Sequence, residues 1–153
     1  MPAPPGVRVS PIVLTRSGEF VVDGVPVTHP GVRAALWEGL RRGPEGWRVD
    51  ALGGTRAVAL EDVPWFVRAV SPGAEGLRLW MQDGSIEPLR GPLRLSREGV
   101  LYAPVRGELA RFLRPAQAQV EPFLRGARGE GPPWEIANGN VPVPVLPLEE
   151  DAA

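Results

Sequence analysis

The sequence contains no cysteine, no lysine and only one histidine among its 153 residues. The absence of cysteine excludes disulfides, thiolate metal sites and cysteine nucleophiles. A single histidine, His29, cannot form a histidine cluster around a metal, and any catalytic triad would have to use it. Without lysine the chain has no Gly-Lys-Ser phosphate loop, and no predicted helix follows Gly53-Gly54. We therefore expect no metal and no cofactor.

The sequence also lacks an excess of charge and long apolar runs. Seventeen basic residues, all arginine, are interspersed with eighteen acidic ones, and the net charge is −1. Because no basic stripe results, we expect no nucleic-acid partner. No run approaches the roughly 18 apolar residues of a membrane span, and residues 1–6 show no basic or apolar region of a secretion signal. These features predict a cytoplasmic protein with no membrane partner.

Glycine and proline are abundant, with nineteen of each, and they are spread over almost every predicted turn. This distribution is typical of many short elements joined by tight connections. The hydrophobic fraction of 43% is close to the globular average. A chain of this length can bury a core as one domain or as two small subdomains.

Alternating and β-branched patterns predict many short strands. Asp23-Gly24 lies between two β-prone arms and predicts a hairpin with a type I′ turn. Strands are expected at residues 12–14, 19–27, 47–52, 55–60, 65–70, 77–81, 85–89, 93–96, 100–103, 134–137 and 141–145.

Two regions have helical patterns. Thr28-His29-Pro30 predicts a helix start, with either of the first two residues as the cap, and the apolar residues of 31–42 recur at spacings of three and four. A second helical region is expected from Arg106. Pro115 lies inside it and should divide it into two short helices, because its ring blocks a helical hydrogen bond.

Antiparallel runs with helices set apart predict an α+β fold rather than a wound parallel sheet. A strand, a helix and an antiparallel meander occur twice in this order, which predicts two small similar subdomains. We expect a flexible Pro-rich arm at residues 1–11, the first subdomain at 12–84, the second at 85–148 and a frayed acidic tail at 149–153.

The stretch from Leu60 to Trp65 places Glu61, Asp62 and Pro64 between two apolar runs, a pattern typical of two strands joined at a tight acidic corner. With this stretch the chain resembles the DUF1285 family of bacterial proteins of unknown function, from about Gly18 to about Val145. Other matching pieces are Thr28-His29-Pro30, Glu45-Gly46, Tyr102, Val105-Arg106, Glu108-Leu109-Ala110, and Trp134 with Gly139.

The resemblance implies two similar α+β subdomains with a role in signalling or ligand binding, and it supplies no catalytic residues. The chain departs from the family pattern at Met81-Gln82-Asp83-Gly84-Ser85, where the family tends to have Thr-Asn-x-Gly-Asp, and at Pro115. A smaller resemblance, to the UPF0598/DUF4505 family, covers the first helix and the end of the chain.

The candidate site residues have both functional and structural interpretations. Glu61 and Asp62 could carry acid/base chemistry, but adjacent residues of an extended chain point in opposite directions, so a corner paired with Arg56 or Arg68 is the preferred interpretation. His29 is expected to cap or pack a helix. Most of the five tryptophans should be core, and Trp65 and Trp80 border turns where they could meet a ligand.

The sequence thus predicts a binding or regulatory module rather than an enzyme. An unknown small ligand or protein partner would bind at the subdomain junction, with Glu61, Asp62, Trp65, Trp80, His29 and Arg68 as candidate binding residues. Two alternatives stay open. One is a hydrolase that uses Glu61, Asp62 and His29, and the other is a structural protein that forms homo-oligomers through strand edges or tryptophans.

Overall fold

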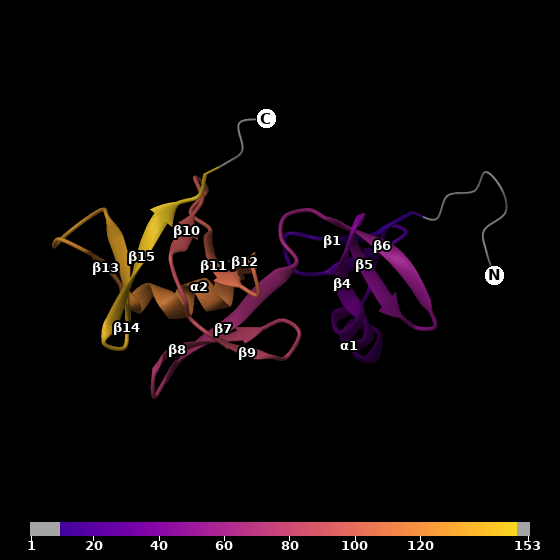
Figure 1. Ribbon diagram of the computed structural model, residues 1–153, viewed down its shortest axis with the longest axis horizontal. Coiled ribbons are helices and arrows are strands. Elements are labelled where there is room, and N and C mark those ends of the chain that lie inside the picture. Colours follow the sequence, from indigo (N-terminus) through magenta and orange to yellow (C-terminus); the bar gives the residue numbers. More distant parts are fainter. Residues whose placement is uncertain (1–9, 150–153) are drawn as a thin grey trace. The chain divides into compact units, whose positions relative to one another are not determined.

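The computed structural model of the protein describes residues 10–149 and divides the chain into two compact units, one ending at Asp62 and the other starting at Val63 (Figure 1). Each unit combines a mixed β-sheet with a helix, so the predicted α+β fold is confirmed. Residues 1–9 of the predicted arm and 150–153 of the predicted tail lie outside the described residues. Between residues 10 and 149, no helix has the length and apolar character needed to cross a membrane.

The border between the units lies at Asp62 and Val63, whereas the sequence placed it between Gly84 and Ser85. The reason is the pairing of β7 (Trp65–Gly73), which runs parallel to β12 (Glu108–Phe112). β8 (Gly76–Met81) and β9 (Ile86–Pro88) then extend the same sheet from β7. Because β7 pairs with a strand far along the chain, these three strands belong to the second unit.

The first unit is a six-stranded sheet in the order β3-β2-β1-β6-β5-β4, with one helix. The two central strands, β1 and β6, are parallel, and the other neighbours are antiparallel. The elements are β1 (Ile12–Leu14), β2 (Phe20–Val22), β3 (Val25–Pro26), α1 (Pro30–Gly39), β4 (Leu40–Gly43), β5 (Gly46–Ala51) and β6 (Gly54–Leu60). α1 contacts β5, and the rings of Phe20 and Trp37 meet edge-to-face with centroids 4.7 Å apart.

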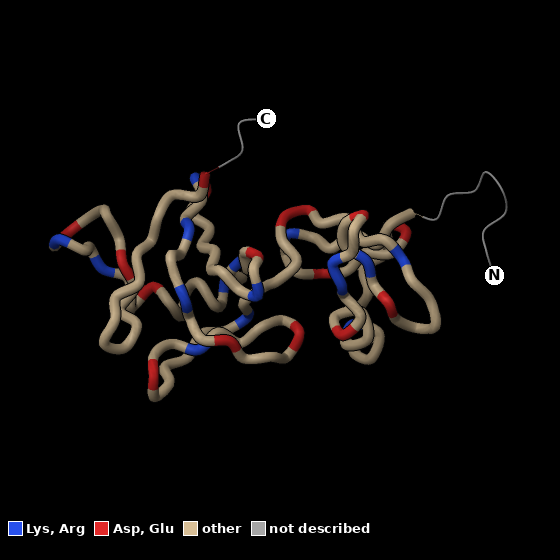
Figure 2. Tube along the Cα trace, in the orientation of Figure 1, with Lys and Arg blue, Asp and Glu red and all other residues tan. Residues whose placement is uncertain are grey.

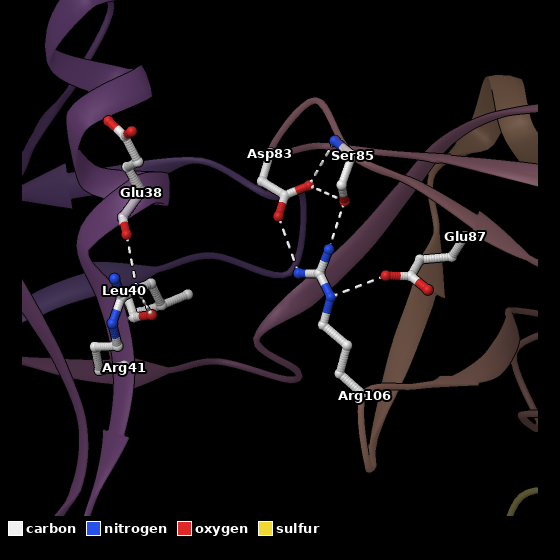
Figure 3. A network of polar contacts seen from close by, with 7 residues as sticks. All are labelled: Glu38, Leu40, Arg41, Asp83, Ser85, Glu87 and Arg106. Atoms are coloured by element: carbon white, nitrogen blue, oxygen red, sulfur yellow. Dashed lines mark hydrogen bonds and ion pairs between the residues drawn. The ribbon is translucent and has the colours of Figure 1, made fainter.

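Helix α1 begins as predicted and ends three residues early. His29 caps its start, since its Nδ1 accepts hydrogen bonds from the Gly31 and Val32 amides at 3.1 and 3.3 Å. At its end Gly39 approaches the β5 backbone so closely that a Cβ atom there would collide with the Asp50 carbonyl oxygen. The chain then leaves the helix for β4, where the Arg41 guanidinium donates to the carbonyls of Glu38 and Leu40, at 2.7 and 2.9 Å (Figure 3).

The second unit is a nine-stranded sheet in the order β13-β14-β15-β10-β11-β12-β7-β8-β9. Its two parallel contacts are β15 with β10 and β12 with β7. The remaining elements are β10 (Leu93–Leu95), β11 (Leu101–Val105), α2 (Arg114–Val120), the 3-10 turn η1 (Glu121–Phe123), β13 (Leu124–Gly126), β14 (Trp134–Asn138) and β15 (Val141–Pro147). Buried side chains of α2, Ala116 and Val120, join the apolar residues of the strands in one core.

The helix predicted from Arg106 is wrong over its first part. Arg106 and Gly107 have φ values of 53° and 80° and form the turn of the β11–β12 hairpin. Residues 108–112 then pair with both β11 and β7, and this pairing outweighs their helical spacing of apolar residues. Pro115 does not break a helix, because it lies in the first turn of α2, where its missing N–H costs nothing.

The two units share one chain path. In the first unit, three strands, α1 and three more strands follow one another, and the first strand pairs in parallel with the last. In the second unit, β10 to β12, α2 and β13 to β15 follow the same order, and β10 pairs in parallel with β15. This agreement confirms the prediction of two similar subdomains, with β7 to β9 added at the β12 edge of the second.

Candidate functional site

The residues predicted for a site fall in both units. Glu61, Asp62 and His29 belong to the first unit, and Trp65, Arg68 and Trp80 to the second.

Glu61 holds a corner of the first unit. Its backbone N–H donates to the Leu14 carbonyl at 2.9 Å and so extends the β1–β6 pairing by one residue. Its Oε1 accepts a hydrogen bond from the Arg16 amide at 3.0 Å and lies 3.9 Å from Nε of the same arginine. Asp62 follows on the surface. This geometry supports the structural interpretation of the acidic corner.

The hydrolase alternative gains no support from His29. Its Nδ1 is occupied by the two amides at the start of α1, which is the capping role predicted for it. Residues 10–149 also contain no group of three or more histidine, cysteine or acidic side chains that could hold a metal ion.

Trp65 lies in an arginine-centred network of the second unit. The Arg106 guanidinium stacks over the Trp65 ring, 4.8 Å from its centroid. The same guanidinium donates to Asp83 Oδ2 at 2.9 Å, Glu87 Oε1 at 3.0 Å and Ser85 Oγ (Figure 3). These contacts join the β8–β9 turn to the β11–β12 turn, and Arg106 has two carboxylates as partners.

The network shifts the titration of its members. Burial alone would raise the pKa of Asp83, but hydrogen bonds from Ser85 and Arg106 outweigh it and hold the pKa below its ordinary value of 3.8. Burial alone would lower the pKa of Arg106, but the hydrogen bonds and charges of Asp83 and Glu87 raise it. Both groups therefore stay charged near neutral pH, and the network acts as a fixed ionic link between two turns.

Trp80 and Arg68 have separate surroundings on β7 and β8. Trp80 Nε1 donates to Ser71 Oγ at 2.8 Å across the strand pair. Arg68 is exposed and lies at a β-bulge, where the register of the pair shifts between Val67 and Ala69.

The strongest candidate site is a groove at one corner of the second unit, which we name the corner groove. It has a volume of about 1040 Å³ and runs between β10, β15 and the segment that leads into β14. Its lining consists of Leu95, Ser96, Arg97, Pro132, Pro133, Trp134, Val145, Leu146, Pro147, Leu148 and Glu149. Most of these side chains are apolar, and only Arg97 and Glu149 carry charge.

The turn that borders the corner groove shares three hydrogen bonds with a turn of the first unit. Ser96 N donates to the Val100 carbonyl at 2.9 Å and Gly99 N to the Ser96 carbonyl at 3.0 Å, while Ser96 Oγ accepts from Val100 N at 3.0 Å. In the first unit Thr15 makes the corresponding bonds with Gly18 and Glu19, at 2.8, 3.0 and 3.2 Å. The second β-strand of each hairpin therefore starts from the same backbone geometry.

A second, smaller pocket of about 360 Å³ lies on β8 and β9 and includes Ile86, Glu87 and Arg78 in its lining. Asn138 closes one side, where its Oδ1 accepts from Leu77 N at 2.6 Å and its Nδ2 donates to the Leu89 carbonyl at 3.2 Å. Charged residues of both signs are interspersed along the described chain of each unit, as Figure 2 shows. Apolar area rather than charge thus distinguishes the corner groove.

Sequence reasoning missed the corner groove. It singled out Trp65 and Trp80 among the tryptophans, whereas Trp134 lines the groove. The sequence pattern that could have revealed the groove is the similarity of Leu14-Thr15-Arg16 to Leu95-Ser96-Arg97. In both segments glycine lies two residues after the arginine. This likeness marks equivalent corners, and the residues after β6 and β15 could then have been compared.

Comparisons with known proteins agree with the fold. No family model and no curated protein matches the chain. A DUF1285 family protein from Silicibacter pomeroyi has a similar structure, with a TM-score of 0.68 and 16% identity over 87% of this chain and 78% of that one. A DUF1285 family protein from Shewanella baltica has a TM-score of 0.51 and 16% identity over 67% of this chain and 84% of its own.

At this identity the two solved structures establish a likeness of fold. No comparison bears on the weaker resemblance to UPF0598/DUF4505, which stays a prediction. The resemblance to the DUF1285 family, predicted from the acidic corner and the motifs around it, is confirmed in the fold of the chain.

Proposed function

We propose that the protein is a cytoplasmic binding module with a regulatory role, and that it takes an apolar ligand in the corner groove of the second unit. The observation that carries the proposal is the groove itself, whose apolar lining by Leu95, Trp134 and Leu148 is typical of small-molecule sites. The signalling role implied by the DUF1285 resemblance would follow from such binding. The groove lies within one unit, so this proposal does not depend on the junction between the subdomains.

Binding suits this lining better than catalysis. The one hydroxyl in the groove, that of Ser96, is mostly buried and accepts a hydrogen bond from Val100 N. A nucleophile needs an adjacent base, and the charged groups of the lining are the guanidinium of Arg97 and the carboxylate of Glu149. Four of the six predicted site residues, Glu61, His29, Trp65 and Trp80, have structural partners inside their own units.

A neutral fluorescent probe tests the proposal. N-phenyl-1-naphthylamine, which brightens in apolar sites, should bind the purified protein with one saturable site. Leu148→Arg places a charge at the groove and should remove most of this signal. Ile86→Arg is the matched control, because Ile86 is an exposed apolar residue that lines the smaller pocket.

The control variant should bind the probe as the unaltered protein does. Loss of the signal in Ile86→Arg but not in Leu148→Arg would move the site to the smaller pocket and contradict our assignment. Absence of a saturable signal in the unaltered protein would contradict the binding proposal itself. Thermal melts of both variants verify that the fold is kept.

A further inference from the structure

The corner of the first unit shows what its turn binds. The Arg16 amide donates to a carboxylate oxygen of Glu61 at 3.0 Å, with the Arg16 guanidinium Nε 3.9 Å from the same oxygen. A backbone N–H and an arginine from one residue thus hold one carboxylate. Hydrogen bonds with a charged partner are among the stronger ones in proteins.

The corner of the second unit has the same backbone without the carboxylate. Leu148 occupies the place of Glu61, since its N–H donates to the Leu95 carbonyl at 2.9 Å just as the Glu61 N–H donates to the Leu14 carbonyl. Arg97 occupies the place of Arg16, two residues before the turn glycine. Over residues 10–149 the Arg97 amide and guanidinium have no protein acceptor, and both belong to a residue that lines the corner groove.

We propose that the corner groove binds a small amphipathic monocarboxylate. The carboxylate accepts hydrogen bonds from the Arg97 amide and guanidinium, and the aliphatic or aromatic body of the ligand lies on Leu95, Trp134 and Leu148. This inference rests on the proposed function and adds the chemical class of the ligand. The first unit supplies the carboxylate from its own chain, and the second takes it from the ligand.

The surroundings of Arg97 favour one negative charge. Glu149 lines the groove and Glu98 follows Arg97 in the turn, and both are exposed. A second anionic group on the ligand would meet these two carboxylates and be repelled. Sulfate-like or phosphate dianions are therefore poorer ligands than a monocarboxylate.

The strands around the groove favour a small molecule over a peptide. β15 is paired on both sides, with β14 and β10, and β10 is paired with β15 and β11. An extended peptide therefore finds no free strand edge to add to. Its amides would also face the side chains of Leu95, Trp134 and the prolines, which offer few hydrogen bonds.

Octanoate and octanamide test the inference by titration calorimetry, because they share one apolar chain and differ in charge. The unaltered protein should bind octanoate about tenfold or more tightly than octanamide, as a charge-assisted hydrogen bond requires. Leu148→Glu supplies the missing carboxylate and should abolish the preference, while Leu148→Met should keep it. Arg97→Gln should weaken octanoate binding, and Arg16→Gln, at the corner of the first unit, should not.

The outcomes separate the two proposals. Equal affinity for octanoate and octanamide, or an octanoate preference that survives both Leu148→Glu and Arg97→Gln, would sink the carboxylate inference and leave the binding groove intact. Failure of both compounds and of the neutral naphthylamine probe to bind would sink the proposed function as well. An acetylated dipeptide with a free carboxyl-terminal leucine that binds more tightly than octanoate would show that the partner is a peptide.

Discussion

The corners that close the central parallel strands differ between the two units in the residue that follows the last strand. After β6 the chain continues with Glu61, which binds the Arg16 amide and completes a polar corner. After β15 it continues with Leu148, and the equivalent turn at Arg97 borders an apolar groove. A common backbone therefore holds a carboxylate of its own chain in one unit and borders an apolar groove in the other.

The hairpin turns of the two units show a second contrast of this kind. Asp23-Gly24 and Arg106-Gly107 have nearly the same φ values, 50° and 80° against 53° and 80°. Asp23 makes an exposed ion pair with Arg56 at 2.9 Å, while Arg106 pairs with the more buried Asp83 at the same distance. The conformation of the turn is shared, and we expect the contribution of its side chain to stability to depend on burial.

We expect the largest loss of stability from a substitution of Arg106, in the hairpin turn of the second unit. Arg106→Asn keeps a residue that tolerates positive φ before glycine, so it removes the guanidinium without straining the turn. It leaves Asp83 and Glu87 without their cation and should cost about 2 kcal/mol of unfolding free energy. Urea denaturation of the variant measures this loss.

Asp23→Asn is the matched change in the first unit. Because the Asp23 side chain is 66% exposed, we expect a loss below about 0.5 kcal/mol. Equal losses for the two variants would remove the distinction between a buried and an exposed turn network.

The next effect concerns the corners. Glu61→Leu gives the first unit the residue found in the second and removes the acceptor of the Arg16 amide, so we expect a loss of about 1 kcal/mol. Leu148→Glu makes the opposite exchange and should cost less, because the new carboxylate can accept the Arg97 amide. Denaturation curves of both variants compare the corners directly. A loss at Leu148 as large as that at Glu61 would mean that the corners are not equivalent.

The sequence predicted features whose cause is local. The turn at Asp23-Gly24, the helix start at His29-Pro30 and the neighbouring strands expected at 134–137 and 141–145 depend on residues that are close in the chain, and all three are present. At the acidic corner, Glu61 accepts a hydrogen bond from the Arg16 amide, which agrees with a structural role for this residue.

Features that depend on distant pairing could not be predicted in this way. β12 has the apolar spacing of a helix and becomes a strand because β7 and β11 lie on its two sides. The border between the units lies at Asp62 and Val63 for the same reason, because β7 pairs with the distant β12. The corner groove is formed by three segments that the fold brings together. The role of Leu148 can be recognised only by comparison with Glu61, the equivalent residue of the first unit.

The smallest expected effect is the response of two aspartates to acid. Hydrogen bonds from Thr55 and Arg48 lower the pKa of the exposed Asp50, and those from Ser85 and Arg106 outweigh burial and lower that of the partly buried Asp83. A lowered pKa in the folded state means stability that is present above the ordinary value of 3.8 and is lost as the pH falls through the folded value.

Asp83→Asn should therefore be less stable than the unaltered protein at pH 7, and this gap in stability should close as the pH falls below 3.8. Asp50→Asn should show a smaller gap that shrinks in 1 M salt. The Debye length falls from about 10 Å at 0.1 M to about 3 Å at 1 M, which screens the attraction between Asp50 and Arg48 but not the hydrogen bond from Thr55. Thermal melts between pH 2 and pH 7 at both salt concentrations measure the two gaps, and a salt-sensitive gap at Asp83 as large as that at Asp50 would show that burial does not separate them.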